Sequence, residues 1–280
     1  MFQIMTLARM LIGLTMVAGS PRVRDPVAIT FPAFSPAHLP MSSQNQLRIP
    51  RTFIQTTPNR TMHKSLASVV ASLQRVNPSY SHRIMLDSEQ VSFMNSPGAA
   101  TLVDGCVPRA YSKITKGAMK ADLFRLAYLA LHGGVYLDID VMALTPLDKI
   151  LSVLDDMVLW LVPKPEHVIQ WVMLAVPKHP VILQALKRAC RNVLTGHRDV
   201  SKKYPEKGDA GIAGPVVVGL AAIDLVGPHR CGRLPLSNAS GAYTLTLLRW
   251  GVKGYSKDVT TQCAAHENAS KPFKHGFYRL

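Results

Sequence analysis

The sequence predicts an α/β fold in which helices cover a β-sheet. Apolar segments of strand length alternate along the chain with segments of helical periodicity, which is the order expected for this class. A length of 280 residues, 48% of them hydrophobic, suffices for one large or two small domains with a sizeable core. Only 18% of the residues are charged and no internal repeat occurs, which excludes a coiled coil, a collagen and a solenoid.

The predicted elements follow from local patterns. Short runs of aliphatic, β-branched and aromatic residues predict strands at 53–56, 83–86, 135–139 and 158–162. Apolar residues at helical spacing predict helices at 64–75, 117–132 and 180–194. The helix 117–132 has the clearest end, because Gly133 and Gly134 follow it directly. The apolar stretch 212–226 is predicted to be a packed helix rather than a membrane span, since Asp224 and its glycines interrupt it.

The N-terminal part is predicted to lie outside the folded domain. Residues 1–20 are mostly apolar, but Arg9 shortens their uninterrupted apolar run to less than a bilayer span. They resemble a signal peptide or signal anchor, with a loosely packed terminal helix as the alternative. Residues 21–46 contain repeated prolines and are typical of a linker or stem. The folded domain is therefore expected to comprise residues 47–280.

The charge and the cysteines restrict the ligands that the protein could bind and the compartments in which it could work. The net charge of +15 predicts anionic partners such as phosphorylated small molecules or acidic membrane. The basic residues are scattered and form no nucleic-acid-binding module, so nucleic acid is not a predicted partner. The four cysteines lie far apart without a CxxC pair, which argues against sulfur-bound zinc and a redox dithiol. They are either disulfide-bonded in a secretory compartment or isolated buried thiols.

Two aspartates interrupt the apolar run 135–141. If that run is a buried strand, Asp138 and Asp140 at positions i and i+2 point to the same face and can converge on one cation. Oxygen ligands favour Mg²⁺ or Mn²⁺, which keep water and substrate phosphate in their remaining positions. The pattern therefore indicates a nucleotide diphosphate ligand. The acid pair Asp155-Asp156 is instead expected to form a turn or a solvated face.

A second charged pair precedes the aspartate run. Asp122 and Arg125 are spaced i, i+3 and share one face of the predicted helix 117–132. Asp122 could accept hydrogen bonds from sugar hydroxyls, and Arg125 could donate to hydroxyl or phosphate oxygens. A structural ion pair is the alternative interpretation.

These segments resemble a known family. Residues 120–125 (KADLFR) followed by 131–141 (LHGGVYLDIDV) are similar to the central signature of glycosyltransferases with the DXD sugar-binding motif, a family 32-like group. The group includes yeast-type initiating α-1,6-mannosyltransferases, inositol-phosphoceramide mannosyltransferases and bacterial capsule transferases. A DxD alone is weak evidence, but this order and spacing of three motifs is highly specific.

The resemblance covers residues 47–184. Residues 49–56 (IPRTFIQT) resemble the opening strand of the family, residues 77–89 a following NPxY segment, and residues 175–180 (AVPKHP) a later AxPxHP element. Tyr111 fits the aromatic position before the central helix. The family resemblance implies a GT-A-like nucleotide-diphospho-sugar transferase fold, with a single mixed sheet flanked by helices and residues 47–280 as its catalytic domain.

The resemblance also assigns candidate residues and a cofactor. Its catalytic residues would be Asp122, Arg125, Asp138 and Asp140. Mn²⁺ or Mg²⁺ is the expected cofactor, with Asp138, Asp140 and His266 as candidate ligands, although a lone histidine is more often a surface residue. The candidate donor-binding residues are Gln55, Thr56, Tyr111, Gly133, Gly134, Tyr136, Gly214 and Pro215.

The C-terminal part departs from the family pattern. Gln170 stands where the family often has Asn, and residues 213–215 read Ala-Gly-Pro instead of TGP. Lys271 stands where Trp is usual in the closing element that His266 resembles.

The resemblance predicts a metal-dependent, retaining glycosyltransferase. Its partners would be a nucleotide diphosphate sugar donor and a glycan or sphingolipid hydroxyl acceptor, and mannose from GDP-mannose is the first choice. Retention would proceed by front-face displacement, since no second carboxylate is marked as a nucleophile. The alternatives are a UDP-hexose-using transferase and a noncatalytic basic carbohydrate- or phospholipid-binding protein of the same fold. A metal-dependent phosphohydrolase would need further ligands.

Three acceptor sequons, at 59–61, 238–240 and 268–270, fit a lumenal location. The expected location is the Golgi or another secretory-pathway lumen, with membrane association through the N-terminus, and the cytoplasm is the alternative.

Overall fold

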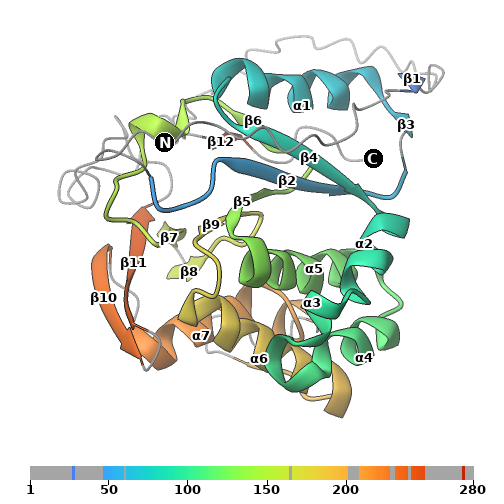
Figure 1. Ribbon diagram of the computed structural model, residues 1–280, viewed down its shortest axis with the longest axis vertical. Coiled ribbons are helices and arrows are strands. Elements are labelled where there is room, and N and C mark those ends of the chain that lie inside the picture. The colour runs from blue at the N-terminus through green and yellow to red at the C-terminus, as the bar shows by residue number, and fades with distance from the viewer. Residues whose placement is uncertain are drawn as a thin grey trace, which may run out of the picture.

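A mixed β-sheet with helices on both faces forms the body of the protein (Figure 1). The computed structural model describes residues 27–28, 47–59, 61–163, 166–200, 208–227, 231–238, 241–249 and 273–274. Seven strands of the sheet run in the order β10-β11-β7-β9-β5-β2-β4, and β8 pairs with β7. These strands are β2 (Thr52–Thr57), β4 (Ser81–Leu86), β5 (Gly134–Leu137), β7 (Met157–Pro163), β8 (Glu166–Val168), β9 (Val172–Ala175), β10 (Gly232–Asn238) and β11 (Gly241–Arg249).

Strand directions confirm the α/β class and the mixed sheet. β2 is parallel to both β4 and β5, whereas β9 is antiparallel to β5 and to β7. β11 is parallel to β7 and antiparallel to β10. Four short strands form two separate two-stranded pairings among the described residues, β1 (Val27–Ala28) with β3 (Thr61–Met62) and β12 (Phe273–Lys274) with β6 (Met142–Ala143).

Helices cover the two faces unequally (Figure 1). The helix α1 lies on one side of the sheet, and the helices α2 to α7 lie on the other. Successive side chains of β2 point to opposite faces of the sheet, so Phe53 packs in one core cluster and Ile54 in another. The helices are α1 (Lys64–Val76), α2 (Asp87–Met94), α3 (Pro97–Ala100), α4 (Cys106–Lys113), α5 (Gly117–His132), α6 (Pro180–Thr195) and α7 (Pro215–Val226), with short 3₁₀ turns η1 (Leu102–Gly105), η2 (Leu147–Lys149) and η3 (Gly208–Gly211).

The predicted helices are confirmed. The prediction at 117–132 matches α5 at both ends, and those at 64–75 and 180–194 each fall one residue short of the observed C-terminus. The stretch 212–226 contains α7, whose Val216, Val217 and Val218 are buried in the protein. The helical segment Gly208–Val226 is nevertheless long and apolar enough to cross a membrane by composition, and half of that window is buried.

Two expectations about acidic residues are wrong. The strand predicted at 135–139 ends at Leu137, and Asp138 and Asp140 lie in a turn in which the Val141 N–H donates to the Asp138 carbonyl (3.0 Å). Asp155 closes a turn, in which its N–H donates to the Ser152 carbonyl (3.0 Å), as one of the two alternatives predicted; the other alternative, a solvated face, is wrong, since Asp155 and Asp156 are each at most 2% exposed.

Distant partners explain why the Asp155-Asp156 pair is buried. Asp155 accepts from the Arg233 guanidinium (2.8 Å) and the Thr246 hydroxyl (2.7 Å). Asp156 accepts from the Thr244 backbone N–H (2.8 Å) and pairs with Arg48 (2.9 Å). Burial of a carboxylate is tolerated only when it is paired and hydrogen-bonded in this way.

The cysteines take both states left open by the sequence. Cys106 and Cys190 are buried free thiols in the core between α4 and α6, whereas Cys231 is disulfide-bonded. The predicted N-terminal segments 1–20 and 21–46 fall almost entirely outside the described residues, as do His266 and Lys271.

Candidate active site

A two-glycine turn sets the approach to the site. Gly133 (φ +65°) and Gly134 (φ +103°) link α5 to β5 in backbone conformations that L side chains rarely adopt. A Cβ on Gly133 would lie 2.7 Å from the Ala175 carbonyl oxygen of β9, and one on Gly134 would lie 2.9 Å from the Thr52 oxygen of β2. The glycines therefore let α5 fold back tightly on the sheet, which places Asp122 and Arg125 beside the end of β5.

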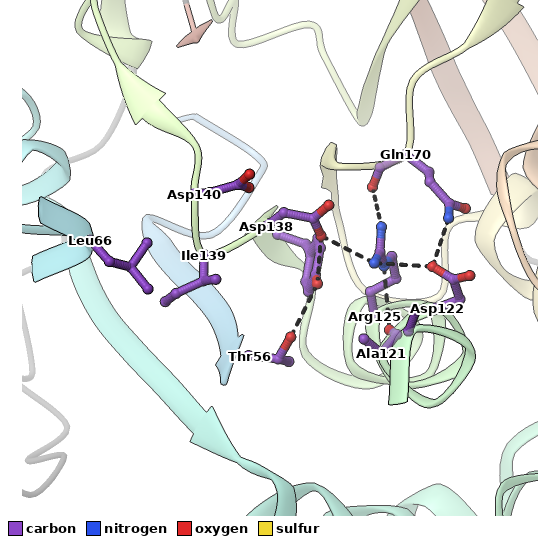
Figure 2. Close-up of a pocket in the computed structure, with 11 residues that line it drawn as sticks. Thr56, Leu66, Ala121, Asp122, Arg125, Asp138, Ile139, Asp140 and Gln170 are labelled. Carbon is purple, nitrogen blue, oxygen red and sulfur yellow. Dashed lines mark hydrogen bonds and ion pairs between the residues drawn. The ribbon is translucent and has the colours of Figure 1, made fainter. Parts of the chain in front are cut away.

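A cavity of about 400 Å³ lies at this end of β5 (Figure 2). Its polar walls combine the inner face of α5 with the turn that follows β5. Its lining residues are Thr56, Leu66, Ala118, Ala121, Asp122, Arg125, Tyr136, Asp138, Ile139, Asp140 and Gln170. Four predicted catalytic residues, separated by up to eighteen positions in the sequence, are thus brought to one cavity.

Arg125 is the centre of the polar network. Its guanidinium is only 5% exposed, and Nη2 pairs with Oδ1 of Asp122 (3.0 Å) and with Oδ1 of Asp138 (3.1 Å). Nη1 donates to the Gln170 carbonyl (2.9 Å), and the group lies over the Tyr136 ring at 4.4 Å. Figure 2 shows Arg125 between the two carboxylates. Burial disfavours the charged guanidinium, but the neighbouring negative groups, Asp138 first, outweigh it and raise the pKa of Arg125 above its ordinary value.

Asp122 lies in a buried part of the site. Its Oδ1 accepts from the Gln170 Nε2 (2.7 Å) as well as pairing with Arg125. Burial raises the pKa of Asp122 to about 6, although the charge of Arg125 opposes this shift. A carboxylate of this kind is ionised at neutral pH and protonated in mildly acidic solution.

The turn after β5 is fixed by side chains from β2 and β5. The Tyr136 hydroxyl donates to Oδ1 of Asp138 (3.0 Å) and lies 3.3 Å from the Thr56 hydroxyl. The Gln55 Nε2 donates to the Asp138 carbonyl (3.0 Å). Asp140 lines the cavity on the far side of Asp138 from Arg125 (Figure 2). The two aspartates reach the same cavity through a turn, and not through strand alternation as the sequence suggested.

Several predicted donor-binding residues do not line the cavity. Gln55 is fully buried, where its Nε2 donates to the backbone of the aspartate turn and its Oε1 lies 2.9 Å from the His82 Nε2. Tyr111 is buried in α4, where the Lys120 ammonium lies 5.5 Å from its ring. Gly214 and Pro215 begin α7, where a Cβ on Gly214 would lie 2.6 Å from the Ala210 Cα. These positions, together with the glycine turn, shape the backbone around the site.

Sequence reasoning missed part of the wall. The sequence marks Gln170 only as a departure from the family pattern, yet Gln170 contacts both Asp122 and Arg125. Ala118 and Ala121 also line the cavity. Their spacing from Asp122 and Arg125 on one helix face was a usable signal, because residues three and four apart share a face.

The residues present fit a hard divalent cation with a substrate phosphate. Among the described residues, no group of three or more His, Cys, Asp and Glu side chains is placed to hold a metal ion by itself. Asp138 and Asp140 nevertheless supply carboxylate oxygens to one cavity. Mg²⁺ commonly binds through one or two carboxylates and takes water and phosphate oxygens as its other ligands. Predicted ligand His266 lies outside the described residues.

Known proteins share the sequence around this cavity. Residues 63–154 match the family described as the glycosyltransferase sugar-binding region containing the DXD motif. A relative, the initiation-specific α-1,6-mannosyltransferase of Candida albicans, is 37% identical over 76 residues. Those residues make up 27% of this chain and 19% of the relative, so the match spans about a fifth of the relative's length.

Two solved structures are similar to part of this chain. The PaToxG glycosyltransferase superposes with a TM-score of 0.49 at 16% identity, over 63% of this chain and 69% of that chain. The ligand-free glycosyltransferase domain of the YGT toxin gives a TM-score of 0.40 at 8% identity, over 63% and 77%. The family match spans the cavity residues Asp122, Arg125, Asp138 and Asp140. Residues 63–154 of this chain are therefore similar to the glycosyltransferase sugar-binding regions that contain a DXD motif.

Proposed function

We propose that this protein transfers a hexosyl group from a nucleoside diphosphate sugar to a hydroxyl acceptor, with Mn²⁺ or Mg²⁺ held at Asp138 and Asp140. One observation carries the proposal: Asp122, Arg125, Asp138 and Asp140 converge on a single cavity of about 400 Å³. This is large enough to enclose a sugar and part of its diphosphate, since ligand sites typically begin at about 300 Å³.

The residues divide the work by position. Asp122, on α5 with the small cavity-lining residues Ala118 and Ala121, accepts hydrogen bonds from the hydroxyls of the donor sugar. Arg125 fixes Asp122 and Asp138 relative to each other, so that sugar and diphosphate bind in one register. A divalent cation bound with the diphosphate would neutralise the charge that the leaving group gains.

The transfer itself exchanges one bond for another. The bond between the anomeric carbon and the β-phosphate oxygen breaks, and the acceptor hydroxyl oxygen bonds to the same carbon. The hydroxyl proton passes to the departing diphosphate. Asp122 is tied to Arg125 and Gln170 through Oδ1, which supports a holding role rather than nucleophilic attack. Front-face displacement with retention of configuration is therefore the mechanism we propose.

Mannose from GDP-mannose is the donor we propose first. The support is the relative from Candida albicans, whose name describes an α-1,6-mannosyltransferase. A UDP-hexose is the second choice. The acceptor would be a glycan or a sphingolipid headgroup.

We further propose that the protein works in a secretory-pathway lumen, with membrane association through its N-terminus. The disulfide at Cys231 supports an oxidising compartment. Asn59 of the first sequon is exposed and follows directly after β2, where a glycan could be attached. Protein made in a eukaryotic host should lose mass on endoglycosidase treatment, and unmodified sequons would contradict a lumenal location.

A donor screen tests the proposed function. The full chain would be melted with GDP-mannose, UDP-glucose, UDP-galactose and UDP-N-acetylglucosamine, each with Mn²⁺ and with chelator. A ligand that binds the folded state raises the melting temperature by mass action, so one donor should give a metal-dependent shift. Sugar transfer to an acceptor should follow with that donor. Folded protein that responds to no donor would instead favour a noncatalytic binding protein.

Asp140→Asn provides the matched control for this screen. It should leave the melting temperature without ligand unchanged and abolish the metal-dependent part of the shift. Metal-dependent binding that survives this change would show that the cation lies elsewhere.

A further inference from the structure

We infer that Gln170 is a positioning residue, which orients the Asp122 carboxylate for the donor sugar, and that its side chain serves binding more than stability. The inference rests on the proposed function. Gln170 lies between β8 and β9, outside the segment that matches the glycosyltransferase family. It is 9% exposed and forms part of the cavity wall.

Gln170 contacts both members of the charged pair. Its Nε2 donates to Oδ1 of Asp122 at 2.7 Å, and its backbone carbonyl accepts from Nη1 of Arg125 at 2.9 Å. Hydrogen bonds to a charged group are stronger than neutral ones. A single residue from the loop before β9 thus fixes the face of α5 that lines the cavity.

Arg125 cannot orient Asp122 alone. Its Nη2 is shared between Oδ1 of Asp122 (3.0 Å) and Oδ1 of Asp138 (3.1 Å), and a shared donor constrains each acceptor less. The amide of Gln170 supplies the second contact to the same Oδ1. With the carboxylate held through Oδ1, Oδ2 is left to accept a hydrogen bond from a sugar hydroxyl.

Stability alone does not explain a glutamine at this position. Its Oε1 is buried and has no hydrogen-bond partner within the described part of the structure. A buried acceptor without a partner lowers stability, and a methionine of similar length would carry no such atom. The favourable hydrogen bond from Nε2 to Asp122 is therefore accompanied by an unsatisfied Oε1 on the same amide. Such a compromise is expected where geometry at a site matters more than folding free energy.

Gln90 provides a matched control within the same chain. It is also buried, at 2% exposure, and its Nε2 also donates to an aspartate, Oδ1 of Asp87 (3.1 Å). It belongs to α2 and does not line the cavity. Gln170→Met and Gln90→Met therefore each remove a hydrogen bond from a buried glutamine amide to an aspartate, one inside the site and one outside it.

The experiment measures binding by calorimetry with the full chain in Mn²⁺. For the wild type and both variants, the affinity for the nucleotide sugar chosen by the donor screen is divided by the affinity for its nucleoside diphosphate. This ratio isolates the sugar contribution, because losses of overall stability affect both ligands alike. Gln170→Met should lower the ratio about tenfold, the effect of one hydrogen bond to a charged group, while Gln90→Met leaves it within about twofold.

Three outcomes would overturn the inference. An unchanged ratio in Gln170→Met, with the wild type still binding the nucleotide sugar, would refute the role of Gln170 and leave the proposed function standing. An equal fall in Gln90→Met would assign the effect to lost packing. A wild type that binds no nucleotide sugar would refute both proposals. Should Gln170→Met fail to fold, Gln170→Asn serves by the same criterion, since its amide is one methylene too short to reach Asp122.

Discussion

Replacing Arg125 by methionine tests whether the charged cluster is as tightly coupled as its geometry indicates. The guanidinium is 5% exposed and pairs with Asp122 and Asp138, of which Asp122 is also buried. Removing one partner of a buried ion pair typically lowers the free energy of unfolding by about 3–5 kcal/mol, because a buried charge loses its counterion. We expect a loss of this size for Arg125→Met at pH 8.

The pH dependence of that loss follows from Asp122. Burial raises its pKa to about 6 from an ordinary 3.8, so its ionisation in the folded protein is unfavourable by about 3 kcal/mol. A raised pKa means that this penalty is absent below about pH 4 and complete above about pH 6. Without Arg125, whose charge lowers the pKa of Asp122, the pKa must rise further. The variant should therefore lose more stability than the wild type as the pH rises from 5 to 8.

Urea unfolding of both proteins at pH 5 and pH 8 is the assay. The difference between them should shrink at pH 5, where Asp122 is mostly protonated in each, by about 1 kcal/mol or more. Arg51→Met is the control, because Arg51 pairs with Asp148 where both side chains are over a third exposed. Such pairs contribute about 0–1 kcal/mol. A loss in Arg125→Met no larger than in this control, or one that is equal at both pH values, would refute the reasoning.

Three further predictions concern single residues. Gly133→Ala should lower the free energy of unfolding by about 2 kcal/mol or more, because the residue has φ +65° and its Cβ would lie 2.7 Å from a carbonyl oxygen. Thermal unfolding would measure this loss. Gly117→Ala is the control, since Gly117 lies in open space at the start of α5 and its replacement should be neutral or slightly stabilising. Asp155→Asn should lower stability by about 3 kcal/mol in urea unfolding, since the Arg233 guanidinium loses its charged partner, and a change below 1 kcal/mol would mean that the amide replaces the carboxylate without loss. Donor-sugar affinity should fall as the pH drops below about 6, where Asp122 takes up a proton and no longer accepts two hydrogen bonds; calorimetry at pH 5 and 7.5 would check this, and equal affinities would exclude the Asp122 carboxylate from the sugar site.

Elements whose start, periodicity and end are all encoded in one stretch of sequence could be predicted from the sequence. The helix 117–132 was predicted at both ends, because its apolar spacing and the two glycines after it are contained within one stretch of sequence. The end of β5 was not, because the turn at Asp138 depends on the Gln55 amide of a strand 83 residues earlier. A reader of the local run sees only apolar residues and two acids, which fit an extended strand equally well.

Partners remote in sequence also decided the burial of single residues. In the sequence, Asp155 and Asp156 resemble surface acids. In the fold, both are buried because residues distant in sequence bind them: Arg233 and Thr246 bind Asp155, and Thr244 and Arg48 bind Asp156. Gln170 belongs to the same class of error, since nothing in its neighbourhood points to Asp122, 48 residues away. Motif spacing was enough to predict site residues such as Asp122 and Asp138. The residues that hold these side chains in place, such as Gln170, could be identified only from the folded structure.

The burial of Asp155 and Asp156 also orders events during folding. Both acids immediately precede β7. Arg48 lies earlier in the chain, but Arg233, Thr244 and Thr246, which provide further partners, arrive with β10 and β11; Asp156 and Thr244 are 88 residues apart. A ribosome adding about 5–20 residues per second exposes this turn for several seconds before its partners emerge. During that interval β7 cannot enter the sheet without stranding ionised carboxylates in an apolar core. In the nascent chain the apolar strand β7 therefore stays outside the sheet until β10 and β11 emerge, and β7 is the segment where chaperone binding would protect the chain most.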